Sequence, residues 1–254
     1  MKALVRLLAV GLMAMGVGIV VGQLLAPKPK PMPSEPLGKL KYGNELFAKG
    51  NYLPPKVDEL TRYKLATEKP HPLAVVVISA DPRVAPEVLF NRELGELFVV
   101  RTFGNVVDET MLASIEYAVE HLKVPLIVVV GHVPCELVKA VASGKRWKGR
   151  PAHLLSQWET VLREVKATHP HLKGEALEKR LVQAHVRYVL RTLLERSAII
   201  QTRHKMGKLE LAGGVYHLRE GKVEWLEDPK THTMEAARHA SKASHEPHES
   251  AAHH

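Results

Sequence analysis

The sequence is poor in cysteine and in aromatic residues. Cys135 is the single cysteine among 254 residues, which excludes an intramolecular disulfide. Aromatic residues make up 5%, so a core must be built from aliphatic side chains. The formal net charge is +9, but no aromatic signature or recognition motif of a nucleic-acid-binding protein accompanies the basic residues. The positive charge therefore indicates a solvated surface or one that faces anionic lipid, and no nucleic-acid partner.

The first 26 residues predict a membrane segment. Lys2 and Arg6 precede an apolar run, Leu7–Ala26, that is about long enough to cross a bilayer as a helix. Because Leu24-Leu25-Ala26 is a poor cleavage site, we predict an uncleaved signal-anchor, with a cleaved signal peptide as the alternative. The positive-inside rule then places the following domain on the periplasmic side of the inner membrane. The alternative is secretion to the periplasm.

Two further segments differ in composition from a folded domain. Residues 27–36 are proline-rich and predict an extended spacer. Residues 228–254 contain six of the fifteen histidines and no large aliphatic residue except Met234. This tail is expected to be disordered, with weak metal collection as an alternative. Residues 37–227 remain as the folded domain.

The elements of this domain follow from its apolar patterns. Continuous apolar runs predict buried strands at Leu73–Ile78, Leu97–Val100 and Leu126–Val130. Asp108–Leu122 has helical spacing with Asp108 as N-cap, which predicts a parallel crossover between the last two strands. Similar patterns predict helices at Leu37–Ala48, Pro151–Thr168 and Gly174–Arg196, a helix-plus-loop arm at Asn51–Pro72, and late strands at Leu209–Tyr216 and Val223–Trp225. The expected class is α/β, with a mostly parallel central sheet flanked by helices and an extended helical N-terminal arm.

Three short pieces follow the three predicted buried strands: Ser79–Arg83, Gly104–Val107 and Gly131–Cys135. Loops at the carboxyl ends of parallel strands are where open α/β sheets build ligand sites. These pieces are therefore the expected functional site.

The same pieces and the segments between them resemble the β-class carbonic anhydrases, over about residues 37–226. The resemblance is carried by Asp81-x-Arg83-Val84, Gly95–Arg101, Gly104–Asp108, Ser114–Ala118, Val124–His132 followed by Cys135, Gly213–Tyr216 and Gly221–Trp225. It implies the β-carbonic anhydrase fold and a zinc ion held by two thiolates and one imidazole, with water as the fourth ligand. Zinc lowers the pKa of this water, and the hydroxide attacks carbon dioxide. His132 and Cys135 match two metal ligands, and Asp81 and Arg83 match the pair that gates or orients the site.

Five positions depart from the family pattern. Ser79 stands at the first ligand cysteine, and a neutral hydroxyl is a poor zinc ligand. The other departures are Pro82, Phe103, Val133 and Glu136. This pattern favours a pseudoenzyme, a scaffold or assembly subunit of the cell envelope in which the interconversion of carbon dioxide and bicarbonate is weak or lost. The alternative is an active, zinc-dependent carbonic anhydrase in which Asp81, His132 and Cys135 hold the metal with balanced charge.

Two other chemistries use the same residues. Ser79, His132 and Asp81 have the residue types for acyl transfer, but no Gly-x-Ser-x-Gly elbow is present. A hydrogen bond between Ser79 and an unmetallated His132 is the simpler interpretation. The second chemistry would use Cys135 and His132 together as a reactive thiol pair. The resemblance further implies a homodimer or higher oligomer in which the arm, residues 37–67, wraps a neighbouring subunit. If the protein is a scaffold, we expect it to bind a protein partner in a membrane complex.

Overall fold

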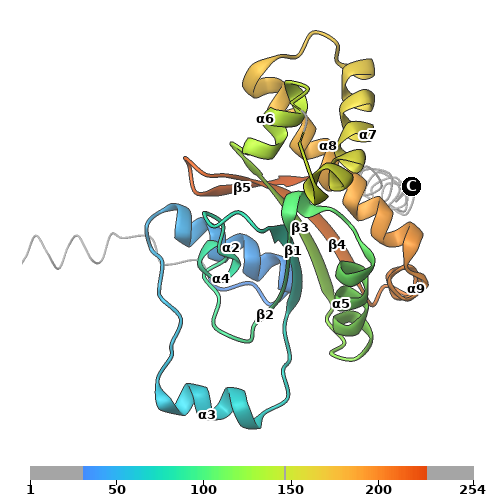
Figure 1. Cartoon of the computed structure of the whole chain (residues 1–254). Coiled ribbons are helices and arrows are strands. Elements are labelled where there is room, and N and C mark those ends of the chain that lie inside the picture. The colour runs from blue at the N-terminus through green and yellow to red at the C-terminus, as the bar shows by residue number, and fades with distance from the viewer. Residues whose placement is uncertain (1–30, 146, 228–254) are drawn as a thin grey trace, which may run out of the picture. The chain divides into compact units, whose positions relative to one another are not determined.

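The structure of the protein, a computed structural model, describes residues 31–145 and 147–227. A five-stranded sheet lies at its centre in the order β2-β1-β3-β4-β5 (Figure 1). Its strands are β1 (Ala74–Ser79), β2 (Leu97–Thr102), β3 (Leu126–Val133), β4 (Glu210–His217) and β5 (Lys222–Leu226). All pairings are parallel except that of β4 with β5. The predicted mostly parallel sheet is confirmed.

Helices surround this sheet and include three that the sequence did not predict. The helices are α2 (Pro36–Ala48), α3 (Glu59–Thr67), α4 (Pro86–Leu89), α5 (Glu109–Glu120), α6 (Glu136–Ala142), α7 (Arg150–Thr168), α8 (Gly174–Arg196) and α9 (Ala198–Lys205), and the 3₁₀ turn η1 (Phe103–Asn105) follows β2. The unpredicted helices α4, α6 and α9 have four, seven and eight residues. Such lengths are too short to show a repeating apolar face.

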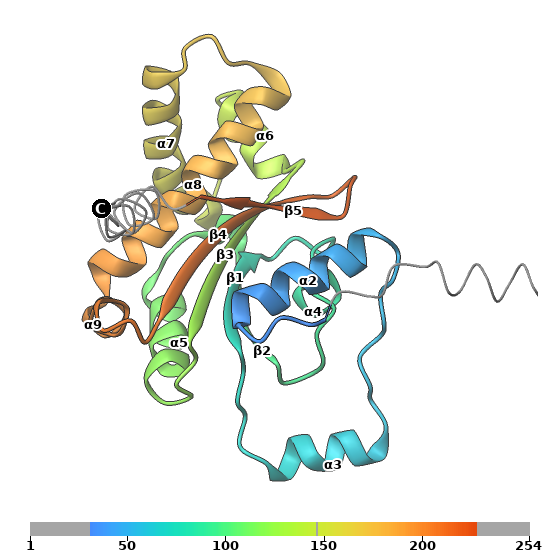
Figure 2. The same ribbon diagram turned by 180° about the vertical axis from the view of Figure 1, so that it is seen from behind.

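The sheet is covered on both faces. Val75 and Val77 of β1 belong to the cluster packed by α5, α8 and α9, whereas Val76 and Ile78 belong to the cluster that contains residues of α2 and α4. Figures 1 and 2 show these two groups of helices on opposite sides of the sheet. Because side chains alternate along a strand, a strand buried on both faces is apolar throughout. The uninterrupted apolar run of β1 is thereby explained.

The N-terminal arm divides into two parts that behave differently. Helix α2 packs on its own chain, since Leu40 is fully buried and the helix contacts β5 and α4. A Cβ at Gly43 would lie 1.8 Å from the Phe90 carbonyl oxygen, so this close approach depends on glycine. Helix α3 buries no residue, and Figure 1 shows it apart from the sheet.

The predicted membrane segment, the tail 228–254 and residues 27–30 of the spacer lie outside the described residues. Among the helices of residues 31–145 and 147–227, none is both long and apolar enough to span a bilayer.

Replacing Asn44 with alanine is expected to lower the free energy of unfolding by about 2–4 kcal/mol. The Asn44 amide donates to the carbonyl oxygens of Leu89 (3.2 Å) and Gly221 (2.9 Å), and its Oδ1 accepts from the Val223 N–H (2.8 Å). The substitution leaves these backbone groups without their partner. Urea unfolding measures the change. The exposed neighbour Glu45→Ala serves as control and should stay within about 0.5 kcal/mol of wild type; similar values for both variants would contradict the role of Asn44.

Candidate active site

The three predicted pieces meet at the carboxyl ends of β1 and β3. A cavity of about 20 Å³ is lined by Ser79, Gly104, Asn105, Gly131, His132, Cys135, Val138, Trp158, Val182, His185 and Val186. Ile78 of β1 pairs with Val130 of β3 in parallel. The residues that directly follow this pair are Ser79 in β1 and Gly131 in β3. Cys135 follows as the N-cap residue of α6. The sheet therefore brings Ser79, His132 and Cys135 to one cavity.

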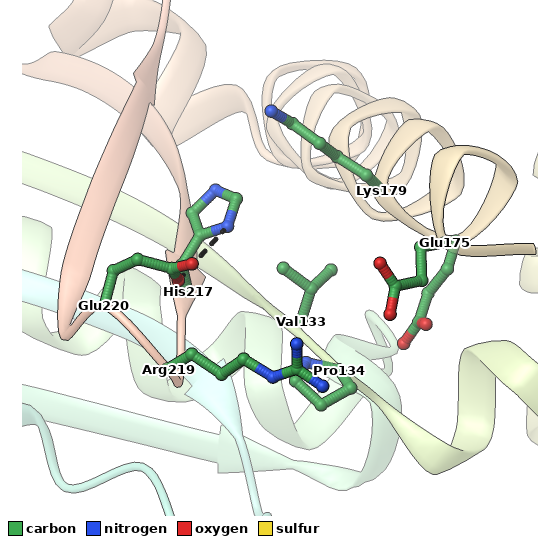
Figure 3. Close-up of a pocket in the computed structure, with 8 residues that line it drawn as sticks. Val133, Pro134, Glu175, Lys179, His217, Arg219 and Glu220 are labelled. Atoms are coloured by element: carbon green, nitrogen blue, oxygen red, sulfur yellow. Dashed lines mark ion pairs between the residues drawn. The ribbon is translucent and has the colours of Figure 1, made fainter.

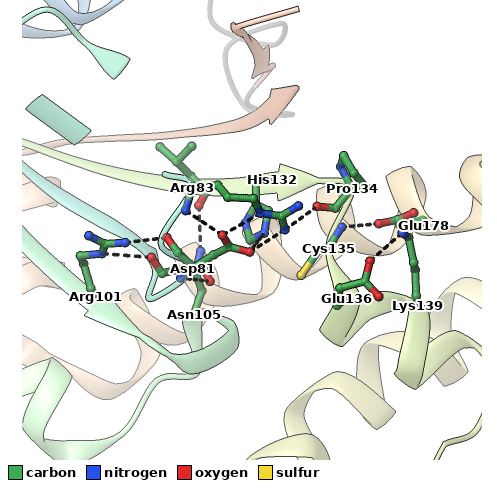
Figure 4. Close-up of polar contacts among 12 residues, drawn as sticks. Asp81, Arg83, Arg101, Asn105, His132, Pro134, Cys135, Glu136, Lys139 and Glu178 are labelled. Carbon is green, nitrogen blue, oxygen red and sulfur yellow. Dashed lines mark hydrogen bonds and ion pairs between the residues drawn. The ribbon is translucent and has the colours of Figure 1, made fainter. Parts of the chain in front are cut away.

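Asp81 is held by Arg83 through both carboxylate oxygens (Figure 4). Nε of Arg83 donates to Oδ1 at 2.9 Å and Nη2 donates to Oδ2 at 2.6 Å. These hydrogen bonds hold the pKa of the Asp81 carboxyl well below its usual range. Arg101 fixes the same loop, because its guanidinium donates to the carbonyl oxygens of Ser79 (3.2 Å) and Asp81 (2.7 Å). Both oxygens of the Asp81 carboxylate thus accept hydrogen bonds from Arg83.

His132 is buried, with an exposed fraction of 3%, and its Nε2 has no hydrogen-bond partner. Asp81 Oδ2 lies 3.3 Å from this nitrogen. Burial lowers the pKa of His132, so the imidazole is neutral at neutral pH. A neutral imidazole with a free Nε2 has the form that binds a metal or a hydrogen-bonding guest.

Cys135 is also buried, and burial raises the pKa of its thiol. Its backbone N–H donates to Glu178 Oε1 at 2.5 Å. Glu178 also lines a separate pocket of about 170 Å³, together with Val133, Pro134, Glu175, Lys179, His217, Arg219 and Glu220 (Figure 3). Glu178 therefore fixes the backbone of the Cys135 loop from the side of this outer pocket.

Ser79 does not form the hydrogen bond expected from the sequence. Its Oγ accepts from the Asp81 N–H at 3.2 Å, and His132 Nε2 remains unpaired. Acyl transfer requires a nucleophile hydrogen-bonded to its base, and the structure shows no such bond between Ser79 and His132.

The zinc that the resemblance implies requires three protein ligands. The unpaired Nε2 of His132 and the thiol of Cys135 fit two of them. The hydroxyl of Ser79 is neutral, and Asp81 is engaged by Arg83. Across residues 31–145 and 147–227, no three His, Cys, Asp or Glu side chains are grouped so that they could hold one metal ion. The described side chains thus do not fit the three-ligand site.

Of the five positions that the sequence analysis interpreted as departures from the family pattern, only Ser79 lines the inner cavity. Val133 lies in the outer pocket, and Glu136 is exposed and pairs with Lys139 Nζ at 2.8 Å. Phe103 is 37% exposed and packs its ring 6.0 Å from that of Trp147. The change within the cavity is therefore confined to one position.

Two residues of the cavity were not singled out from the sequence. His185 of α8 is 2% exposed, and its ring stacks on Trp158 at 3.8 Å with an interplanar angle of 4°. Trp158 Nε1 in turn donates to the Gly104 carbonyl oxygen at 3.0 Å. The available sequence signal was that His185 lies within the apolar stripe of α8, between Val182 and Val186. Burial lowers the pKa of His185 to about 3.

Comparison with known proteins gives consistent matches. The family model described as "Carbonic anhydrase" matches residues 74–223. A "Carbonic anhydrase" of Mycolicibacterium smegmatis is 38% identical over 190 residues, which is 73% of this chain and 89% of the relative. "Carbonic anhydrase 2" of Mycobacterium tuberculosis is 37% identical over 186 residues, which is 72% of this chain and 88% of the relative.

Solved structures share the fold as well. The β-carbonic anhydrase of Coccomyxa in complex with acetazolamide matches with a TM-score of 0.61 and 27% identity over 74% of this chain and 90% of that one. Tetrameric β-carbonic anhydrases of Sordaria macrospora include a chain with a TM-score of 0.62 and 26% identity, over 66% of this chain and 86% of that one.

Replacing His185 with glutamine is expected to reduce the loss of stability in acid. The pKa of His185 is about 3 in the folded protein and about 6.5 in an unfolded chain, so the unfolded state binds more protons between these values. The stability of the wild type must therefore fall as the pH is lowered from about 6.5 toward 3, by up to about 1.4 kcal/mol per pH unit from this group. Urea unfolding at a series of pH values measures both slopes, and parallel curves would contradict the assignment.

Proposed function

Because the chain belongs to the β-class carbonic anhydrase family, we propose that it is a family member with a degenerate zinc site, in which interconversion of carbon dioxide and bicarbonate is weak or lost. The observation that carries this proposal is Ser79 at the place of a ligand cysteine, with its hydroxyl hydrogen-bonded to the Asp81 N–H. The retained fold would then serve as a scaffold or assembly subunit.

The charge at the site supports the proposal. Two thiolates neutralise Zn²⁺, whereas Cys135 alone would leave one positive charge in a buried cavity. The pKa of the Cys135 thiol is raised by burial, so a metal would also have to displace its proton. Both effects reduce zinc affinity relative to a site with two cysteines.

The proposed setting is the cell envelope, as a homo-oligomer held at the membrane. Residues 1–26 would anchor the chain with its domain on the periplasmic side, or would be removed after export. Oligomers occur among the solved relatives, since those of Sordaria macrospora are described as tetrameric. In this chain the exposed side chains of Leu53, Leu60 and Tyr63 support contact of the arm with a second copy or with a partner of a membrane complex.

An active zinc-dependent carbonic anhydrase is the competing function. It is favoured by the distance of 3.3 Å between Asp81 Oδ2 and His132 Nε2, which places a carboxylate beside a ligand imidazole. Zinc held by Asp81, His132 and Cys135 would be neutral in net charge. Asp81 would then have to give up its hydrogen bonds to Arg83.

Zinc content and carbon dioxide hydration distinguish the two functions. Protein lacking residues 228–254 is used, because the histidines of this segment would bind metal on their own. We expect far less than one zinc per chain by elemental analysis, and hydration near the uncatalysed rate in a stopped-flow assay. One zinc per chain with hydration, both lost in Asp81→Asn, would overturn the proposal and establish the competing function.

Ser79→Cys is expected to raise the zinc content to about one per chain, because it restores the second thiolate and the other four departures lie outside the cavity. Ser79→Ala is the matched control and should bind no more zinc than the wild type. Elemental analysis after dialysis against zinc measures the gain. No gain in Ser79→Cys would show that positions outside the cavity also prevent metal binding.

A further inference from the structure

The outer pocket contains unpaired charges of both signs. This pocket, of about 170 Å³, lies between the first turns of α8, the Val133-Pro134 segment and the turn that joins β4 to β5. Glu175 comes from α8, and Arg219 comes from the turn. Among the described residues, neither side chain has a hydrogen-bond or ion-pair partner. One anion and one cation of the pocket are therefore available to a ligand.

Glu178 is the buried charge of this pocket. Its exposed fraction is 5%, and carboxylates are rarely buried to this degree without partners. Oε1 accepts the Cys135 N–H, whereas Oε2 has no hydrogen-bond or ion-pair partner in the described part of the chain. Burying a carboxylate oxygen is costly unless a donor faces it, and a charged donor forms the strongest hydrogen bond. The free Oε2 therefore indicates a place for an ammonium group.

The other two basic residues of the pocket are engaged by a carboxylate outside its lining. Lys179 Nζ pairs with Glu224 Oε2 at 2.7 Å, and His217 Nε2 lies 3.0 Å from the same oxygen. Oε1 of Glu224 accepts from Gln183 Nε2 at 2.9 Å, which holds this carboxylate in place. Lys179 is thus committed to Glu224 and is not free to neutralise Glu178.

We propose that the outer pocket binds a small zwitterion of the α-amino-acid class. Its ammonium group donates to Glu178 Oε2 and to Glu175, and its carboxylate accepts from the guanidinium of Arg219. Figure 3 shows Glu175 and Arg219 directed toward Val133 and Pro134, which lie between them and offer an apolar surface to the carbon atoms of the ligand. No residue of the inner cavity takes part. The proposal therefore does not depend on whether zinc is bound.

Simpler ligands match the charges less well. An amine alone would leave Arg219 unpaired, and a carboxylate alone would face the negative charges of Glu175 and Glu178. A space of about 170 Å³ is several times that of one water molecule. Across residues 31–145 and 147–227, no three potential ligand side chains are grouped to hold a metal ion, which disfavours a cation. Only a molecule with both charged groups satisfies both walls of the pocket.

Isothermal titration calorimetry of the full chain tests the proposal. The probes are the common L-amino acids, each compared with the amine that lacks its carboxylate and the acid that lacks its ammonium group; for L-alanine these are ethylamine and propionate. We expect at least one amino acid to bind once per chain, and its two partial analogues to bind at least about tenfold more weakly. Binding of no amino acid would overturn the proposal. An amine that binds as tightly as its amino acid would overturn the role of Arg219.

Variants separate the two ends of the ligand. Arg219→Gln is expected to weaken binding of the amino acid by about tenfold or more and to leave the affinity for the amine unchanged. Glu178→Gln should weaken both, and its amide oxygen can still accept the Cys135 N–H. Glu195→Gln is the matched control, because this exposed carboxylate lies on α8 outside the pocket and should bind like the wild type.

Unchanged affinities in both Arg219→Gln and Glu178→Gln would show that the amino acid binds elsewhere and would overturn the site. If Glu178→Gln does not fold, Glu175→Gln replaces it, since Glu175 is exposed and its loss should also weaken both the amino acid and the amine.

Discussion

The burial of β1 on both faces of the sheet is the constraint on which the site depends. Every residue of β1 is buried, and its pairing with β2 and β3 determines which residues lie at the carboxyl edge. A shift of one residue would exchange the two apolar faces and move Ser79 relative to His132. Since both faces pack against helices, the register is strongly specified. The positions of Ser79 and His132 therefore follow from core packing, whether or not either residue binds a metal.

The second determinant is the hydrogen-bonded pair of Asp81 and Arg83. One negative and one positive charge are joined at the edge of the cavity, whereas burial favours neutral His132 and a protonated Cys135. The site is consequently balanced in charge without a metal.

Most of the fold was predictable because its elements are long and regular. Asp108 accepts from the Met111 N–H at 2.7 Å, as expected of an N-cap, and α8 has the predicted bounds. Helices α4 and α6 were missed because one or two turns show no apolar period. The contact partners of α2 could not be predicted, because they depend on Asn44 and Gly43, whose contacts lie in distant segments.

The sequence by itself determined the family, the parallel sheet and the presence of Asp81, Arg83, His132 and Cys135 at one edge, because apolar periodicity and motif spacing are local properties. Only the tertiary structure decided the hydrogen-bond partners. It paired Ser79 with the Asp81 N–H, left His132 Nε2 unpaired and brought His185 into the cavity. Hydrogen bonding and burial depend on segments far apart in the chain: His132 and His185 are separated by 52 residues, and only folding brings them to the same cavity.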